Sequence, residues 1–186
     1  MAEPIHIVTP LTKEKALELK AGDSVLITGT ILAARDAAHK IMVETLDRGE
    51  KLPVDFTDQI IYYVGPSPAK LGHPIGSAGP TTSGRMDAYT PQMIGQGLTG
   101  IVGKGYRSQT VMDSMKENGV VYFAAIGGAA ALIAKSVKKY EVLAYENLGP
   151  EALAALTVED FPAIVIIDTE GNNFYEIGQK PYRKVN

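Results

Sequence analysis

The sequence predicts one α/β domain with a mixed sheet, and three observations support that class. Apolar, β-branched segments alternate along the chain with segments of helical periodicity, which is the pattern of α/β proteins. A chain of 186 residues is long enough to bury one hydrophobic core. No internal repeat, low-complexity tract or linker interrupts it, so residues 1–186 are expected to fold as a single domain.

The expected strands share a high content of apolar and β-branched residues, and they comprise residues 5–8, 24–34, 60–64, 99–103, 120–125, 140–145 and 163–168. The first is expected at an edge of the sheet and the second at its centre. Gly29, inside the second strand, indicates a bulge or close packing. Residues 158–162 are expected to turn into the last strand.

The expected helices combine an apolar face with a capping residue or a run of helix formers, and they comprise residues 12–20, 37–47, 85–94, 108–118, 129–138 and 150–156. Thr12, Asp36 and Ser108 are the candidate N-caps, and Gly119 is expected to close the fourth helix. Pro91 fits its helix only in the first turn of a helix that restarts there.

Composition excludes several classes of function. The chain has no cysteine, so it forms no disulfide or thiol nucleophile and cannot itself supply thiolates to an iron–sulfur cluster. Its three histidines lack metal-ligand spacing, and the net charge of -3 gives no reason to expect nucleic acid. The most apolar stretch, residues 120–134, is too short to cross a bilayer, and the N-terminus does not resemble a secretory signal. A soluble, cytoplasmic protein is therefore expected, with no membrane partner.

A glycine- and proline-rich corner at residues 79–87 (GPTTSGRMD) carries the clearest chemistry. Pro80 stiffens the approach, and hydroxyl residues from Thr81 to Ser83 follow where a helix is expected to begin. Helix N-termini attract anions, and Arg85 adds a planar fork of donors that suits a carboxylate or phosphate. A capped helix start beside a surface arginine is the alternative, and on this stretch alone it is the stronger one.

Two further cations come directly after expected strands. Arg35 follows the central strand, Lys104 follows residues 99–103, and open α/β sheets place ligands at such strand ends. Arg35 is free to point into a crevice, or it forms a salt bridge with Asp36. Lys104 either reaches a bound anion or is a solvated loop lysine.

Five motifs occur in a characteristic order: residues 62–66 (YYVGP), 79–87 (GPTTSGRMD), 103–105 (GKG), 126–132 (IGGAAAL) and 158–162 (VEDFP) with 167–168 (ID). This series resembles the β subunit, or C-terminal domain, of class I iron–sulfur fumarases and L-tartrate dehydratases. The likeness covers nearly the whole chain, and GPTTSxRMD is its most specific part. It implies a swivelling β/β/α fold. It also implies a [4Fe–4S] cluster held by the cysteines of a separate α subunit, which fits the absence of cysteine here.

The resemblance also implies roles for individual residues. Thr81 matches the threonine proposed to exchange the substrate's carbon-bound proton, and Arg85 matches the arginine beside it. Lys104 and Arg35 match residues that bind the carboxylates of a dicarboxylate substrate. Removing a proton next to a carboxylate builds negative charge there, and cations stabilise that charge.

Asp36, His39 and Asp87 are expected to orient the arginines or to cap helices. The threonine hydroxyl is a very poor base, so it needs neighbouring positive charge. Arg85 comes four positions after Thr81, a spacing that would place both side chains on one face of a helix.

The expected function is reversible hydration of fumarate to L-malate by a hydro-lyase β subunit that is active only with its cluster-bearing α subunit. L-Tartrate dehydration to oxaloacetate is an alternative in the same architecture. A non-catalytic module that binds a dicarboxylate or another protein is an alternative of another class, and it would not need Thr81. The implied partners are the α subunit, a dicarboxylate, and further copies in a homo-oligomer or an α2β2 assembly.

Overall fold

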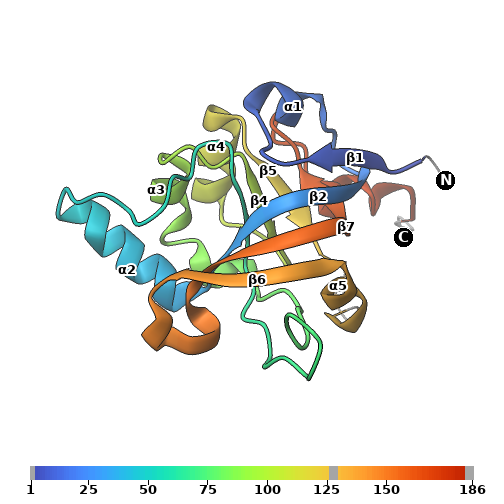
Figure 1. Ribbon diagram of the computed structural model, residues 1–186. Helices are drawn as coiled ribbons and strands as arrows, with labels where there is room; N and C mark the ends of the chain where they lie inside the picture. The colour runs from blue at the N-terminus through green and yellow to red at the C-terminus, as the bar shows by residue number, and fades with distance from the viewer. Residues whose placement is uncertain (1–2, 126–129, 183–186) are drawn as a thin grey trace.

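A seven-stranded mixed sheet with helices packed around it organises the parts of the chain that the computed structural model describes, residues 3–125 and 130–182 (Figure 1). The elements in chain order are β1 (Ile5–Val8), α1 (Lys13–Glu18), β2 (Ser24–Ala33), α2 (Asp36–Asp47), β3 (Ile60–Tyr62), η1 (Ser83–Met86), α3 (Thr90–Ile94), β4 (Gly100–Gly103), α4 (Gln109–Asn118), β5 (Val121–Ala124), α5 (Ala130–Ser136), β6 (Val137–Ala144), η2 (Glu146–Glu151), β7 (Leu153–Ile167), α6 (Phe174–Ile177) and η3 (Lys180–Tyr182). The η elements are 3₁₀ helices.

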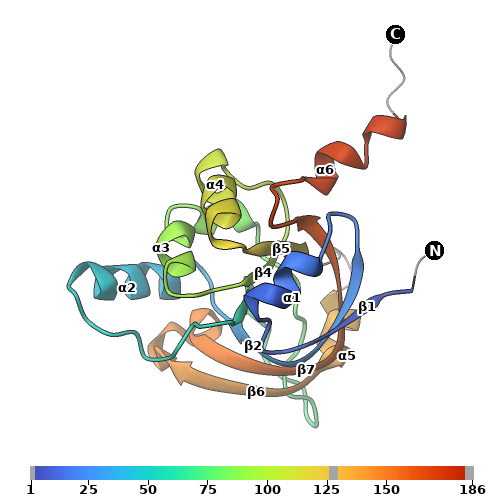
Figure 2. The same ribbon diagram turned by 90° about the horizontal axis from the view of Figure 1, so that it is seen from above.

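Strand β7 closes the sheet into a ring. One edge of β7 pairs antiparallel with β2, and its other edge pairs with β6 near its start and with β5 near its end. Strands β2, β3, β4 and β5 are successive parallel neighbours, so the hydrogen-bonded ladder runs from β2 to β5, crosses to β7 and returns to β2. Figure 2 shows β2, β7 and β6 as a curved layer, with α3 and α4 on the opposite side of β4 and β5.

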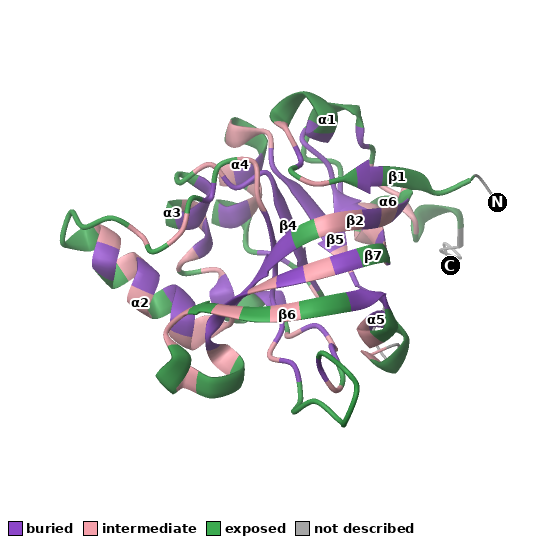
Figure 3. Ribbon diagram, viewed as in Figure 1, coloured by how far each residue is buried: buried purple, intermediate pink, exposed green. Residues whose placement is uncertain are grey.

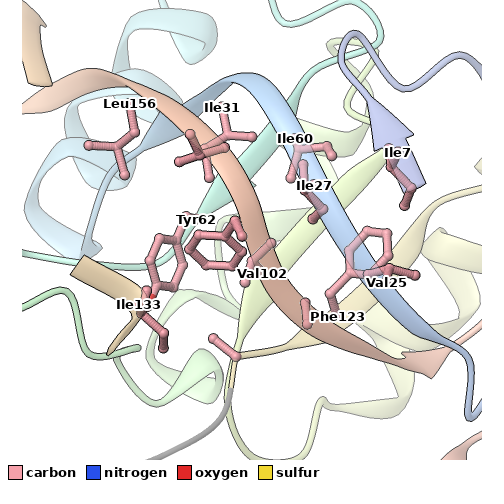
Figure 4. Close-up of a cluster of buried hydrophobic side chains, with 14 of the residues drawn as sticks. Ile7, Val25, Ile27, Ile31, Ile60, Tyr62, Val102, Phe123, Ile133 and Leu156 are labelled. Carbon is pink, nitrogen blue, oxygen red and sulfur yellow. The ribbon is translucent and has the colours of Figure 1, made fainter. Parts of the chain in front are cut away.

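Alternate residues of the strands build two hydrophobic clusters, because successive side chains of a strand point to opposite faces. Ile60 and Tyr62 belong to the inner cluster of the ring, which Figure 4 shows in close-up. Ile61 and Tyr63 belong to the outer cluster. Helices α2, α3 and α4 cover the outer cluster and contribute buried methionines to it: Met42, Met93 and Met115.

The structure confirms the mixed α/β class and most of the predicted elements. β1 lies at one end of the strand order, and β2 is central because it pairs with β1, β3 and β7. Thr12 and Ser108 cap α1 and α4 with their hydroxyl groups, and Gly119 ends α4 in the left-handed conformation. Pro91 lies in the first turn of α3, where proline is tolerated.

The helix predicted at residues 150–156 is wrong, and so is the turn predicted at residues 158–162. β7 runs through most of both segments as one continuous strand. The alanine- and leucine-rich first segment has a high helix propensity, but its pairing with β2 and β6 decides its conformation. The second segment is a bulge, in which Asp160 has a positive φ of 49° and its N–H donates to Oγ1 of Thr28 at 3.0 Å.

The helix predicted at residues 129–138 is shorter in the structure. Its glycine pair, at 127 and 128, lies outside the described residues. α5 is described from Ala130 and ends at Ser136, because the following residues pair with β7 as strand β6.

The carboxyl ends of β2, β3, β4 and β5 lie at one rim of the ring, because these strands are parallel neighbours. A long loop follows β3 at this rim. Residues 67–74 of the loop are exposed, as Figure 3 shows, whereas Ile75 and Ala78 join the inner cluster. In the described part of the chain, no helix has the length and apolar character needed to cross a membrane.

Gly29 provides a test of the contact between β2 and the residues after β1. Its φ is +123°, and an added Cβ would collide with Oγ1 of Thr9. We expect Gly29→Ala to lower the free energy of unfolding by more than the ~1–3 kcal/mol of an unfavourable backbone conformation alone, because the collision adds to that strain. Gly49→Ala is the control in urea unfolding, since Gly49 also has a positive φ (+72°) but lies in open space. Equal losses in the two variants would show that the contact with Thr9 is unimportant.

Candidate active site

The predicted site residues follow the carboxyl ends of three neighbouring strands at one rim of the ring. Arg35 lies just after β2, and Lys104 comes directly after β4. The segment 79–87 crosses between them, with one β-bridge to Val64 after β3 and another to Lys104. The fold thus brings residues that are distant in sequence to adjacent strand ends.

Thr81 does not start a helix, contrary to the prediction. Its N–H donates to the carbonyl oxygen of Tyr63 at 2.8 Å, in a stretch without helical structure. The first helical turn, η1, begins at Ser83 and is a 3₁₀ helix of four residues without a side-chain cap. The β-bridges explain the difference, because they extend the chain across the strand ends. Thr81 and Arg85 therefore do not share a helix face, and this corner has no α-helix N-terminus to attract an anion.

Asp36 links the two predicted arginines. Its Oδ2 accepts a hydrogen bond from Nη2 of Arg85 at 2.6 Å, and its Oδ1 lies 3.7 Å from Nε of Arg35. Burial raises the pKa of the Asp36 carboxyl, but its backbone hydrogen bond and the two arginines outweigh burial, so the pKa lies below its ordinary value. Asp36 does not cap α2 as predicted, because it is the first residue of the helix and Arg35 occupies the N-cap position.

Glu151, which no sequence motif marks, also contacts the start of α2. Its Oε1 lies 3.3 Å from Nη2 of Arg35, and its Oε2 accepts from the N–H of Ala37 at 3.3 Å. The hydrogen bond to Ala37 joins residues 114 positions apart, because η2 brings Glu151 back beside α2. The Nε of Arg35 is still buried without a hydrogen-bond partner among the described residues. The carboxylates of Asp36 and Glu151 therefore hold the Arg35 guanidinium in place, as in the salt-bridge alternative.

Ser83 fixes the backbone beside Lys104. Its Oγ accepts from the N–H of Lys104 at 3.1 Å, and its own N–H donates to the carbonyl of Lys104 at 2.9 Å. Gly103 permits this approach, because a Cβ at that position would collide with the hydroxyl of Ser83. Lys104 is itself exposed, and it lines a largely apolar cavity of about 450 Å³ beside α6.

His39 is fully buried in α2, one turn after Arg35. Its Nδ1 lies 2.8 Å from the carbonyl oxygen of Arg35, and its ring meets the ring of Tyr63 edge-on at 5.2 Å. Burial lowers the pKa of His39 to about 4, and the charge of Arg107 adds to this effect. A neutral ring donates from Nδ1 here, since a carbonyl oxygen only accepts. His39 thus holds the backbone of Arg35.

Asp87 pairs with an arginine outside the predicted set, Arg107. Nε of Arg107 donates to Oδ1 of Asp87 at 2.8 Å, and Nη2 donates to Oγ1 of Thr90 at 2.8 Å. The guanidinium is completely buried over the rings of Tyr63 and Tyr122, 5.4 and 5.2 Å from their centroids. Burial disfavours its charge, but the tyrosines and Asp87 outweigh burial, so the pKa of Arg107 stays above its ordinary value.

Sequence relatives identify the family of the chain. The profile described as "Fumarase C-terminus" matches residues 1–178. The chain belongs to this family. The aerobic class I fumarate hydratase of Salmonella typhimurium is 46% identical over 152 residues, which are 81% of this chain and 26% of that protein. Fumarate hydratase 2 of Leishmania major is 41% identical over 175 residues, 92% of this chain and 31% of that protein.

A third relative matches the chain almost from end to end. The putative L(+)-tartrate dehydratase subunit beta of Methanocaldococcus jannaschii is 43% identical over 183 residues, 95% of this chain and 94% of that protein. This member of the fumarase C-terminus family thus spans about a quarter to a third of the two fumarate hydratases, but nearly the whole of a separate β subunit.

The donor set at the rim suits an anion. Within residues 3–125 and 130–182, no three His, Cys, Asp or Glu side chains gather in a way that could hold a metal ion. The whole sequence also lacks cysteine, so this chain cannot ligate an iron–sulfur cluster through thiolates. Guanidinium, ammonium and hydroxyl groups are instead the groups that bind carboxylates.

The buried His39 predicts a loss of stability in weak acid. Its pKa of about 4 in the folded protein lies below the ordinary value of 6.5, so the unfolded chain binds more protons between these two pH values. We expect its contribution to be complete above pH 6.5 and to fall by about 3 kcal/mol as the pH drops from 6.5 to 4. In urea unfolding across this range, His39→Gln should show a correspondingly shallower pH dependence. Identical pH profiles would contradict a neutral, buried His39.

Proposed function

We propose that this chain is the β subunit of an iron–sulfur hydro-lyase that interconverts fumarate and L-malate. The observation that carries the proposal is the rim. Arg35 and Lys104 follow strand ends there, Thr81 is hydrogen-bonded to Tyr63 just after β3, and Arg85 pairs with Asp36 at the start of α2. Relatives named fumarate hydratase match 81% and 92% of the chain at 46% and 41% identity, which supports the proposal. The swivelling β/β/α architecture, a cytoplasmic location and an α2β2 assembly belong to the same proposal.

A dicarboxylate suits the rim because each of its charges would meet a cation. Arg85 has a half-exposed side chain and Lys104 is exposed, so both can receive a carboxylate from solvent. Arg35 is only 23% exposed and forms the fixed end of the site. Asp36 holds the two arginines together against their mutual repulsion. In the proposed reaction, the same cations stabilise the charge that develops on the carboxylate beside the reacting carbon.

We assign exchange of the carbon-bound proton to the hydroxyl group of Thr81. The residue is half-buried, and its backbone is fixed by the hydrogen bond to Tyr63. A threonine hydroxyl is a very poor base, so in this proposal it acts only where the surrounding cations favour its ionised form. Because Thr81 is not on the helix of Arg85, this influence would come from the whole cation set and not from one neighbouring turn.

The [4Fe–4S] cluster of the proposed enzyme belongs to a cysteine-containing α subunit. The residues of this chain do not fit such a cluster, since the sequence has no cysteine and the rim presents cations. On the α subunit, the cluster would supply a Lewis-acidic iron for the substrate. Binding and orienting the carboxylates, and exchanging the proton, are assigned to this chain's own residues.

L-Tartrate dehydration to oxaloacetate is the second candidate, and one finding favours it. One relative matches this chain over 94% of the relative's length, and that protein is named a putative L(+)-tartrate dehydratase subunit beta. L-Tartrate carries the same two carboxylates as L-malate and one additional hydroxyl group. The rim cations therefore suit both substrates, and discrimination requires contacts to that hydroxyl.

Co-expression with a cysteine-containing α subunit from the same source tests the proposal. We expect a brown, oxygen-sensitive complex that hydrates fumarate, and a parallel assay with L-tartrate separates the two candidates. Activity of the purified β chain alone without iron would contradict the divided site. A complex that binds fumarate but converts neither substrate would instead indicate the non-catalytic binding module.

Substitution of Thr81 distinguishes a catalytic role of the rim from a role in binding alone. In the complex, we expect Thr81→Ala to lower kcat by about 10²–10⁴-fold, the usual contribution of a proton-transfer group, while fumarate binding persists. Thr81→Ser keeps a hydroxyl group and should retain much of the activity. Steady-state kinetics and equilibrium binding of fumarate measure the two effects. Full activity of Thr81→Ala would show that another group moves the proton.

A further inference from the structure

We infer that Arg107 is a positioning residue for the rim site, acting from beneath it through Asp87 and two tyrosines. The inference rests on the proposed function of the rim. Arg107 is three residues beyond Lys104, its side chain is completely buried, and it reaches neither solvent nor a substrate at the rim. Its side chain nevertheless contacts residues that are linked to the segment carrying the proposed substrate-binding groups.

The guanidinium of Arg107 holds the C-terminal end of the segment 79–87. Nε donates to Oδ1 of Asp87 at 2.8 Å, and Oδ2 of Asp87 accepts from the N–H of Ser108, the N-cap of α4, at 2.7 Å. Nη2 donates to Thr90, the first residue of α3. The end of the segment is thereby tied to the starts of two helices.

The two tyrosines whose rings pack against this guanidinium also contact the other end of the segment, Tyr63 through its backbone and Tyr122 through its hydroxyl group. The carbonyl of Tyr63 accepts from the N–H of Thr81 at 2.8 Å. The hydroxyl of Tyr122 lies 2.9 Å from Oγ of Ser83, and the same Oγ accepts from the N–H of Lys104. The buried cation therefore packs against the rings of the two residues that connect to Thr81 and, through Ser83, to Lys104.

Stability alone does not explain a buried cation at this position. Desolvating a guanidinium is costly, and apolar residues of similar volume often pack a core equally well or better. The Nη1 atom of Arg107 is also buried without a partner among the described residues. Apolar side chains cannot form directional hydrogen bonds. The rigid guanidinium fork donates to Asp87 and Thr90 and thereby fixes the orientation of both side chains.

Amide hydrogen exchange of the β chain tests the positioning role directly. The probes are the hydrogen-bonded amides of Thr81, Ser83 and Lys104. In Arg107→Lys, which keeps the charge but loses the fork, we expect these amides to exchange at least about tenfold faster, while amides between β2 and β7 keep their rates. Unchanged exchange at the three probes would overturn the inference.

The double variant Asp87→Leu/Arg107→Met replaces the ion pair by apolar side chains, so a folded protein remains available if Arg107→Lys does not fold. We expect the same faster exchange at the three probe amides. In the complex with the α subunit, we expect a wild-type unfolding midpoint but a kcat/KM about 100-fold lower, the effect of displacing reacting groups by about 1 Å. Wild-type kinetic constants in this variant would overturn the inference.

Ile27→Ala is the control, because Ile27 is fully buried in the inner cluster, whereas Tyr63 and Tyr122 belong to the outer cluster. It should lower the unfolding midpoint and leave kcat and KM unchanged at temperatures where it is folded. An equal loss of kcat/KM in this control would trace the effect to stability and contradict positioning. If the wild-type complex converts neither fumarate nor L-tartrate, the proposed function fails, while the exchange rates still decide the role of Arg107.

Discussion

The pairing of β7 with both β2 and β5 is the constraint on which the rest of the structure depends. This strand joins β2 to β5, so the sheet closes into a ring around the inner cluster. Closure also fixes the carboxyl ends of β2, β3 and β4 at one rim. The hydrogen-bonded ladder of the ring therefore positions Arg35, Thr81 and Lys104. Arg35 and Lys104 come within two residues of the ends of β2 and β4, and Thr81 is bound to Tyr63, just after β3, by one backbone hydrogen bond.

Local patterns predicted strands such as β2, because an apolar and β-branched run favours the extended conformation by itself. They failed at the start of β7, where alanine and leucine favour a helix and only the pairing with β2 and β6 decides otherwise. The prediction of a turn around Asp160 failed for a related reason. An Asp shortly before Pro162 is typical of a turn, but here β7 pairs with β2 on both sides of Asp160, so the local irregularity is a bulge.

The chemistry of the rim was predictable to the extent that it depends on strand ends. Arg35 and Lys104 follow strands directly, so the sequence indicated both. The non-helical position of Thr81 was not predictable, because the bridges of its neighbours Pro80 and Thr82 to Val64 and Lys104 impose it from outside the segment. Glu151 and Arg107 reach their partners across 114 and 20 positions, so their roles exist only in the folded chain. The proximity of Arg107 to the GKG motif is the one local signal it carries.

The charges at the rim suit the proposed division of the active site between two subunits. Arg35, Arg85 and Lys104 are accompanied by the carboxylates of Asp36 and Glu151, which leaves a formal charge of about one positive unit. A dicarboxylate adds two negative charges, so the loaded rim would carry excess negative charge if it closed away from water. Enclosing such a site is unfavourable unless more positive charge arrives. In the proposed enzyme that charge has to come from the α subunit, and the carboxylates of Asp36 and Glu151 allow the cations of this chain to stay together before it does.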